Sequence, residues 1–287
     1  MCVPYKIRKN KTMIIIAEKL NGSIPSCARA IAARDEGYIK DMAKRQADAG
    51  ADYLDLHAGV KEGELDTLKW MIDAVQSVTD CPIAVDSPDV NAIIGAMPFC
   101  SRPGIFNSVS LEGGKIDIAF PLLARPENSK WNVLALLSGE AAIPKTAAGR
   151  MDVFGRIMAK AREHGISESR IYIDPLVEML CTTDDGEGAL MILDVIRQIR
   201  AANPNVHICG AISNVSYNLP VRRLVNQAFA MLAIGAGMDC AIIDPLSGDL
   251  RGMIYAAEAI MGLDDYCAEY TSAYRNGIFG CVASNSK

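Results

Sequence analysis

Neutral hydrogen-bonding side chains are concentrated in the stretch ISNVSYN, residues 212–218. It follows directly from the apolar run ICGAI, which has the composition of a buried strand. The polar residues of the stretch, none of them charged, are Ser213, Asn214, Ser216, Tyr217 and Asn218. A buried strand that ends in such a cluster predicts a ligand rich in hydrogen-bond donors and acceptors, with little charge where it contacts this segment.

Acidic, amide and hydroxyl side chains also stand at the ends of the other apolar runs. They are Glu18, Asn21, Asp55, His57, Asp86, Ser87, Asn107, Ser108, Ser138, Asp174 and Asp244. Any single aspartate at such a place can simply cap the helix that follows, and His57 can be a structural imidazole. The recurrence of acids and amides at one end of many apolar runs favours a binding site, most strongly for Asp86 and Asp174.

The apolar runs themselves are short and rich in Ile, Val and Ala, as expected for strands buried on both faces. They cover residues 13–20, 51–59, 81–87, 104–110, 131–138, 171–176, 207–214 and 238–245. Amphipathic helical segments lie between them, the clearest at residues 37–50, 64–79, 188–203 and 222–237. The chain therefore alternates strand and helix from one end to the other.

Eight such units within roughly 250 residues predict a single (β/α)8 TIM barrel, with residues 1–287 forming one domain. A doubly wound open sheet would also alternate, but no glycine-rich GxGxxG turn follows the first strand. In a barrel, the carboxyl ends of all eight strands meet at one face, where active sites lie. The polar strand-end residues are therefore expected to line a common pocket.

Composition narrows the class of protein further. Half of the 287 residues are hydrophobic, 22% are charged, and the net charge is −5, which argues against nucleic acid as a partner. No apolar run reaches the roughly 18–20 residues of a membrane span, and the start lacks the features of a signal peptide. The nine cysteines form no CxxC pair, which indicates reduced thiols. A cytoplasmic protein is expected.

Several of these stretches together resemble the methyltetrahydrofolate:corrinoid protein methyltransferases, a family that includes the folate domain of cobalamin-dependent methionine synthase. The matching stretches, in the order of the family, are AEKLNG (17–22), ADYLDLHAG (51–59), IAVDSPDVNAI (83–93), IFNSVSLE (105–112), IYIDPL (171–176), ISNVSYN (212–218) and DCAIIDP (239–245). The resemblance implies a TIM barrel, a homodimer, and methyl transfer between N5 of tetrahydrofolate and the cobalt of a corrinoid. The corrinoid would be carried by a separate protein, because the chain has no DxHxxG string. Tetrahydrofolate or 5-methyltetrahydrofolate is then the substrate, and no metal of its own is expected.

The resemblance also assigns roles to residues. It places Asp86, Asn107 and Asp174 on the aminopyrimidinone edge of the pterin, and Asn214 near N5 as the catalytic residue. A neutral amide can accept a hydrogen bond from a protonated N5 and stabilise the developing charge. The further substrate-binding candidates are Asn21, Glu18, Asp55, His57, Ser213, Tyr217 and Asp244. Basic residues considered for the glutamate tail are Arg222, Arg223 and Lys145.

Two departures from the family pattern stand at predicted site positions. His57 replaces an asparagine of the family, and Tyr217 replaces a frequent glutamine. The direction of methyl transfer and the identity of the corrinoid protein stay open.

Four alternatives remain beside this interpretation. A zinc-dependent corrinoid:thiol methyltransferase would use His207 and Cys209, with Cys240 as a third ligand, although a strand over 207–214 puts His207 roughly 20 Å below the strand top. A dihydropteroate synthase would need a Ser-x-Arg on the last strand, which is absent. A barrel that binds folate without catalysis is the third. The fourth is a Schiff-base aldolase, for which Lys19 is the only lysine on a predicted strand.

Overall fold

The computed structural model describes residues 13–280, apart from 61 and 183–187. Its centre is one sheet of eight parallel strands in the order β7-β6-β5-β4-β3-β2-β1-β8. The strands are β1 (Ile14–Asn21), β2 (Tyr53–His57), β3 (Ile83–Asp86), β4 (Ile105–Val109), β5 (Asn132–Leu136), β6 (Ile171–Asp174), β7 (His207–Ile208) and β8 (Cys240–Ile243). A parallel bridge between Ala211 and Ile242 brings the two ends of the sheet together. The sheet is thus a nearly closed barrel.

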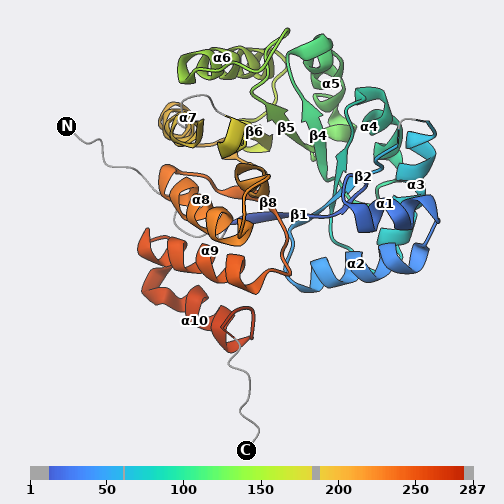
Figure 1. The fold of residues 1–287 in the computed structure, drawn as a ribbon. Helices are drawn as coiled ribbons and strands as arrows, with labels where there is room; N and C mark the ends of the chain where they lie inside the picture. Colours follow the sequence, from blue (N-terminus) through green and yellow to red (C-terminus); the bar gives the residue numbers. More distant parts are fainter. Residues whose placement is uncertain (1–12, 61, 183–187, 281–287) are drawn as a thin grey trace, which may run out of the picture.

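Helices surround this barrel on the outside (Figure 1). They are α1 (Pro25–Ala32), α2 (Glu36–Asp48), α3 (Glu64–Gln76), α4 (Val90–Ala96), α5 (Lys115–Leu123), α6 (Ala147–Glu163), α7 (Gly188–Ala202), α8 (Arg222–Ala236), α9 (Gly248–Ile260) and α10 (Ala268–Arg275). The predicted (β/α)8 barrel is therefore confirmed, whereas the domain boundaries predicted at 1 and 287 lie outside the described residues. None of the helices in the described part is long and apolar enough to cross a membrane.

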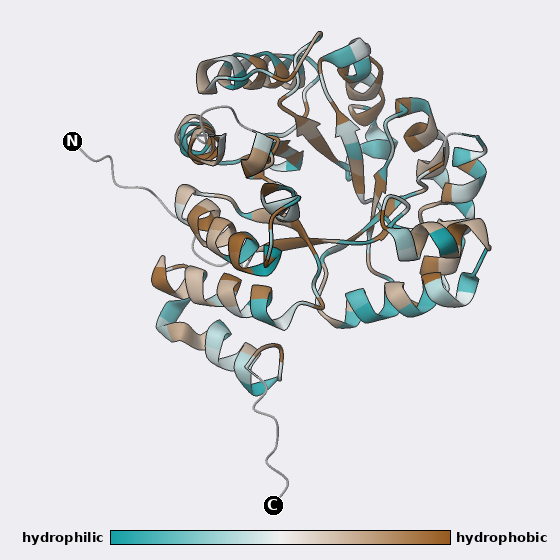
Figure 2. Ribbon diagram, in the orientation of Figure 1, coloured by the Kyte–Doolittle hydropathy of each residue, from teal (hydrophilic) through white to brown (hydrophobic). Residues whose placement is uncertain are grey.

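Alternation along the strands divides the core into two layers. One small cluster fills the inside of the barrel and includes Ile14, Ile16, Ala84, Ile105, Leu134, Tyr172, Cys209 and Cys240. A much larger cluster lies between the outer faces of the strands and the helices. The strands are coloured mostly as hydrophobic in Figure 2. Apolar side chains fill the lower part of the barrel interior. The polar side chains of the strands therefore lie at the upper end, which is formed by the carboxyl ends of the strands.

The seventh strand is shorter than predicted. Residues 207–214 were expected to be one strand, but only His207 and Ile208 pair with β6. Residues Ile212–Ser216 form a 3-10 helix, η6, in which Ser213 and Asn214 lie. Local hydrogen bonds within this segment, such as Asn214 N–H to the Ala211 carbonyl (3.2 Å), replace the ladder. Ser213 and Asn214 are thus held by a turn and not at a strand end.

A close contact between two glycines joins the loops after β1 and β2. The Gly22 N–H donates to the His57 carbonyl at 2.8 Å. A Cβ on Gly22 would lie 2.6 Å from the Ala58 carbonyl oxygen and from Gly59 Cα, and Gly59 has a φ of 70°. Only glycine at both positions permits this approach. The contact fixes the position of the end of β1, where Asn21 lies.

Candidate active site

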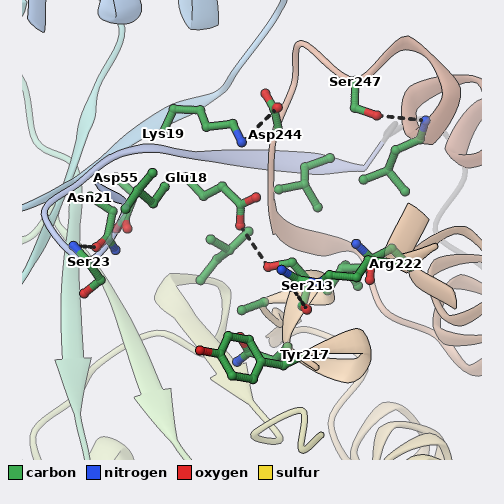
Figure 3. Close-up of a pocket in the computed structure, with 18 of the residues that line it drawn as sticks. Glu18, Lys19, Asn21, Ser23, Asp55, Ser213, Tyr217, Arg222, Asp244 and Ser247 are labelled. Atoms are coloured by element: carbon green, nitrogen blue, oxygen red, sulfur yellow. Dashed lines mark hydrogen bonds and ion pairs between the residues drawn. The ribbon is translucent and has the colours of Figure 1, made fainter. Parts of the chain in front are cut away.

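A cavity of about 920 Å³ opens at the carboxyl ends of the strands. Nine of the eleven site residues predicted from the sequence line it: Glu18, Asn21, Asp55, Asp86, Asn107, Ser213, Asn214, Tyr217 and Asp244. They come from β1, β2, β3, β4, η6 and the end of β8, and several are drawn in Figure 3. The predicted pocket at one face of the barrel is therefore present.

Two buried carboxyl groups and an amide form the deepest polar part of this cavity. Asp55 is only 3% exposed, and the Asn107 Nδ2 donates to its Oδ1 at 3.0 Å. Asp86 is the neighbour of Asn107 in the β3–β4 register. Burial raises the pKa of Asp55 to about 7. It also raises the pKa of Asp86 well above its ordinary value, with Asp55 and Glu64 adding repulsion.

This arrangement suits a ligand edge with several N–H donors. Since Asn107 donates its amide hydrogen to Asp55, its Oδ1 is left to accept a hydrogen bond. The carboxylates of Asp55 and Asp86 accept further ones when ionised. A donor-rich ligand would favour the ionised forms of these acids, which burial alone disfavours.

Asp174 lies at the carboxyl end of β6 but is not among the residues that line the cavity. Its Oδ1 accepts the Leu176 N–H at 2.7 Å, and Leu176 has a φ of 62°. Burial raises the pKa of Asp174 to about 6, while the Leu176 N–H and Arg150 oppose the shift. Its neighbour in the β5–β6 register, Leu136, does line the cavity. Contact between Asp174 and a ligand stays a prediction.

Arg150 of α6 connects the loop after β5 with the loop after β6, which begins at Asp174. Its side chain is fully buried, and Nε donates to the Pro144 carbonyl at 3.0 Å. Nη1 donates to the carbonyls of Pro175 and Leu176. Nη2 forms an ion pair with Glu178 Oε1 at 2.6 Å. Sequence reasoning had not singled out Arg150, because an arginine on an amphipathic helix is usually solvent-exposed.

Glu18 of β1 lies near Asp55 and faces η6. The Ser213 hydroxyl donates to Glu18 Oε2 at 3.3 Å, and Lys19 Nζ pairs with Asp244 Oδ2 at 3.1 Å (Figure 3). Burial raises the pKa of Glu18, although Lys19 opposes the shift. Because Lys19 is engaged by Asp244, it is not an isolated buried amine of the kind that forms a Schiff base.

Asn214 is exposed in the open cavity, and Arg222 fixes the turn that carries it. Arg222 Nη2 donates to the Ser213 carbonyl at 2.7 Å, and Nε donates to Ser216 Oγ at 3.1 Å. Its guanidinium lies 5.6 Å from the centre of the Tyr217 ring. The turn that carries Asn214 is thus held on both sides of that residue, at Ser213 and Ser216.

His57 is also absent from the cavity lining. Its Nδ1 is buried without a hydrogen-bond partner among the described residues. Burial lowers the pKa of His57, and Glu64 partly offsets this effect. A neutral imidazole beside the site is the form that these surroundings favour.

The residues of the zinc alternative lie at the floor of the barrel and have other partners. His207 Nδ1 bonds to Asp239 Oδ2 at 2.9 Å, and its ring stacks on Tyr172 at 4.5 Å. Cys209 is fully buried beside Cys240. Over residues 13–280, less the undescribed ones, no three His, Cys, Asp or Glu side chains are grouped so as to hold a metal.

Comparison with known proteins places the fold and the site in a family. The model of the pterin-binding enzymes matches residues 25–244. The chain belongs to the pterin-binding enzyme family. The resemblance predicted from the sequence stretches is thereby confirmed, and the residues at the strand ends become a candidate pterin pocket.

One curated relative of this pterin-binding enzyme is much more similar in sequence than a shared fold alone requires. It is the methylcorrinoid:tetrahydrofolate methyltransferase of Eubacterium limosum, 41% identical over 271 residues, which cover 94% of this chain and 99% of that one.

Solved structures of dihydropteroate synthases share the fold. The enzyme of Coxiella burnetii with pteroic acid has a TM-score of 0.65 at 19% identity, covering 90% of this chain and 95% of that one. The Xanthomonas albilineans enzyme with 7,8-dihydropteroate has a TM-score of 0.61 at 17% identity, covering 88% and 93%.

Proposed function

We propose that this protein is a methyltransferase that moves a methyl group between N5 of tetrahydrofolate and the cobalt of a corrinoid carried by a separate protein. The observation that carries the proposal is the 41% identity, over nearly the whole chain, to the methylcorrinoid:tetrahydrofolate methyltransferase. The acceptor-rich cavity supports it, because a pterin offers N–H donors along its aminopyrimidinone edge.

In this proposal one group of residues binds the pterin ring and another residue acts at N5. Asp86, Asn107 and Asp174 hold the aminopyrimidinone ring, with Asp55 fixing the Asn107 amide through the 3.0 Å hydrogen bond. Asn214 hydrogen-bonds N5 and stabilises the charge that develops there during transfer. The remaining rate gain comes from placing N5 and the methyl carbon in line with the cobalt.

The corrinoid protein is the partner that the proposal requires. Asn214 and Tyr217 line the cavity and are exposed, so that protein would approach from their side. A homodimer, a cytoplasmic location, and the absence of any nucleic acid, membrane or resident metal are also part of the proposal, as the sequence predicts. The relative's name favours methyl transfer toward tetrahydrofolate.

Methylcobalamin and tetrahydrofolate provide a direct test without the partner protein. The wild type should bind tetrahydrofolate in calorimetric titrations and form 5-methyltetrahydrofolate from methylcobalamin under anaerobic conditions. Asn214→Ala should keep binding but lose roughly 10²–10³ in rate, and Asp86→Asn should lose binding. Asp80→Asn, an exposed carboxylate outside the cavity, is the matched control. A folded wild type that binds no tetrahydrofolate would rule out the proposed function.

A further inference from the structure

The first strand of the barrel, β1, contains one residue more than its neighbour β2 has to pair with it. Ala17 pairs with Leu54, but Leu20 pairs with Leu56, so the register shifts between these two pairs. An extra residue of this kind is a β-bulge, a feature that is frequent at the rims of barrels and next to active sites. The bulge lies between Ala17 and Leu20, close to the carboxyl end of β1.

Side chains alternate regularly in the first half of β1. Ile14 and Ile16 point into the barrel, whereas Ile15 and Ala17 pack in the layer between the strands and the helices. If this alternation continued, every even-numbered residue would point inward and every odd-numbered residue outward. A regular strand would therefore place Leu20 in the polar cavity and two polar side chains in the apolar outer layer.

The observed positions depart from this pattern after the bulge. Leu20 is fully buried in the outer apolar layer, and Asn21 lines the cavity. Glu18 and Lys19 also line the cavity, although they are adjacent in sequence. Lys19 reaches Asp244 at 3.1 Å, whereas Glu18 turns to η6 (Figure 3). The bulge thus directs three polar side chains of one strand toward the cavity.

A buried glutamine on the outer side of the barrel holds this bulge. The Lys19 N–H donates to Gln46 Oε1 at 2.9 Å, and a backbone N–H in a bulge needs such a partner because the ladder is disrupted there. Gln46 belongs to α2, is fully buried, and is not among the residues that line the cavity. Its Nε2 has no hydrogen-bond partner among the described residues. Only the oxygen of this amide therefore has a partner in the protein.

We propose that Gln46 is a positioning residue whose side-chain oxygen fixes the bulge that turns Glu18, Lys19 and Asn21 toward the cavity. Without this acceptor, the Lys19 N–H would be buried and unpaired, and a regular strand that pairs it in the ladder would be favoured. A regular β1 would withdraw these polar side chains from the ligand. The inference rests on the proposed function and adds that tetrahydrofolate affinity depends on a residue outside the cavity.

Two substitutions separate the oxygen of Gln46 from its size. Gln46→Met keeps the length and removes the acceptor. Gln46→Glu keeps the acceptor, because burial favours the neutral carboxyl, and its hydroxyl takes the place of the unpartnered Nε2. In calorimetric titrations, Gln46→Met should weaken tetrahydrofolate binding roughly tenfold, about the contribution of one hydrogen bond, and Gln46→Glu should keep most of the affinity. Gln198→Met makes the same change at an exposed residue of α7 outside the cavity and should leave the affinity unchanged.

A double-mutant cycle shows whether Gln46 acts through β1. Asn21→Ala should itself weaken binding, since the Asn21 side chain hydrogen-bonds Asp55. If Gln46→Met acts by moving the end of β1, its effect on affinity should be smaller in the Asn21→Ala background than in the wild type. A role confined to stability predicts no change in the affinity of the folded protein, and an independent effect on binding predicts additivity.

The outcomes separate the two proposals. A wild type that binds no tetrahydrofolate refutes the proposed function itself. Three results would overturn the positioning role and leave that function intact: Gln46→Met binds as tightly as the wild type, Gln46→Glu loses as much affinity as Gln46→Met, or the effects in the cycle are additive. Amide hydrogen exchange of Lys19 in the wild type decides the case even if Gln46→Met does not fold. An N–H held by a buried acceptor should be protected, and exchange at the rate of an exposed amide would also overturn the positioning role.

Discussion

Replacing Arg150 by lysine tests whether the turn after β6 depends on a single buried guanidinium. In the wild type, Arg150 makes four hydrogen bonds from three nitrogens, to the carbonyls of Pro144, Pro175 and Leu176 and to Glu178. A lysine keeps the charge but has one nitrogen, which cannot reach acceptors spread over two loops. At least two of the four bonds should be lost, and the carbonyls they leave behind are shielded from water.

The expected cost follows from these contacts. A hydrogen bond to a charged group contributes about 1.5–3 kcal/mol. Loss of two therefore predicts a decrease of about 3–6 kcal/mol in the free energy of unfolding, a large part of the ~5–15 kcal/mol typical of a domain. Because the Leu176 N–H also bonds Asp174, the loosened turn should weaken tetrahydrofolate binding in parallel.

Urea denaturation, with calorimetric titration of tetrahydrofolate, would measure both effects. Arg156→Lys on the same helix is the matched control, since Arg156 pairs with Glu140 at the surface, with the two side chains 44% and 58% exposed. That change should leave the free energy of unfolding nearly unchanged, because an exposed ion pair contributes little. If Arg150→Lys were as stable as Arg156→Lys, the interpretation of Arg150 as the residue that positions the turn would be wrong.

Three further changes address the acids and the loop contact. Burial raises the pKa of Glu258 from 4.5 to about 7, so its stabilising contribution is complete below about pH 4.5 and is lost as the pH rises through 7. Glu258→Gln should therefore raise the free energy of unfolding at pH 8 by roughly 2–3 kcal/mol and leave it unchanged at pH 4, measured by urea titration. Burial raises the pKa of Asp55 to about 7, so tetrahydrofolate, which favours the ionised acid, should bind more tightly as the pH rises from 6 to 8. Calorimetry in two buffers should show proton release at pH 7 that Asp55→Asn reduces, and equal release would contradict the role of this acid. Gly22→Ala puts a Cβ 2.6 Å from the Ala58 carbonyl oxygen and should cost about 1–3 kcal/mol, whereas an unchanged melting temperature would show that the loops adapt.

Much of the fold was predictable because buried strands have a local signature. The runs around Ile83, Ile105 and Ile171 are apolar in their middle and polar at their carboxyl ends, and each is a strand of the barrel. In a parallel barrel this end is shared, so the sequence also predicted that Asp55, Asp86 and the other strand-end residues would meet. The same rule failed after Ile208, where η6 replaces the expected strand, because hydrogen bonds to nearby carbonyls compete with the sheet ladder.

The positions of His57 and Asp174 could not be predicted from the strand pattern. Both end a strand as expected, yet neither lines the cavity, since Asp174 turns its carboxylate to the Leu176 N–H and His57 lies beside Glu64. Where a strand-end side chain points depends on the loop that follows it. Those loops are held by contacts between elements that are distant in sequence.

By itself, the sequence indicated most of the strands and helices, the apolar character of the strands on both faces, and the polar residues at the strand ends. These properties follow from composition and from periodicity over a few residues. Only the tertiary structure decided how those polar residues interact: the hydrogen bond from Asn107 to Asp55, the burial of Arg150 between two loops, and the hydrogen bond from Ser213 to Glu18. The contacts of Asn107 and Ser213 join residues 52 and 195 positions apart, and the burial that shifts the pKa values of the acids exists only once the barrel has closed.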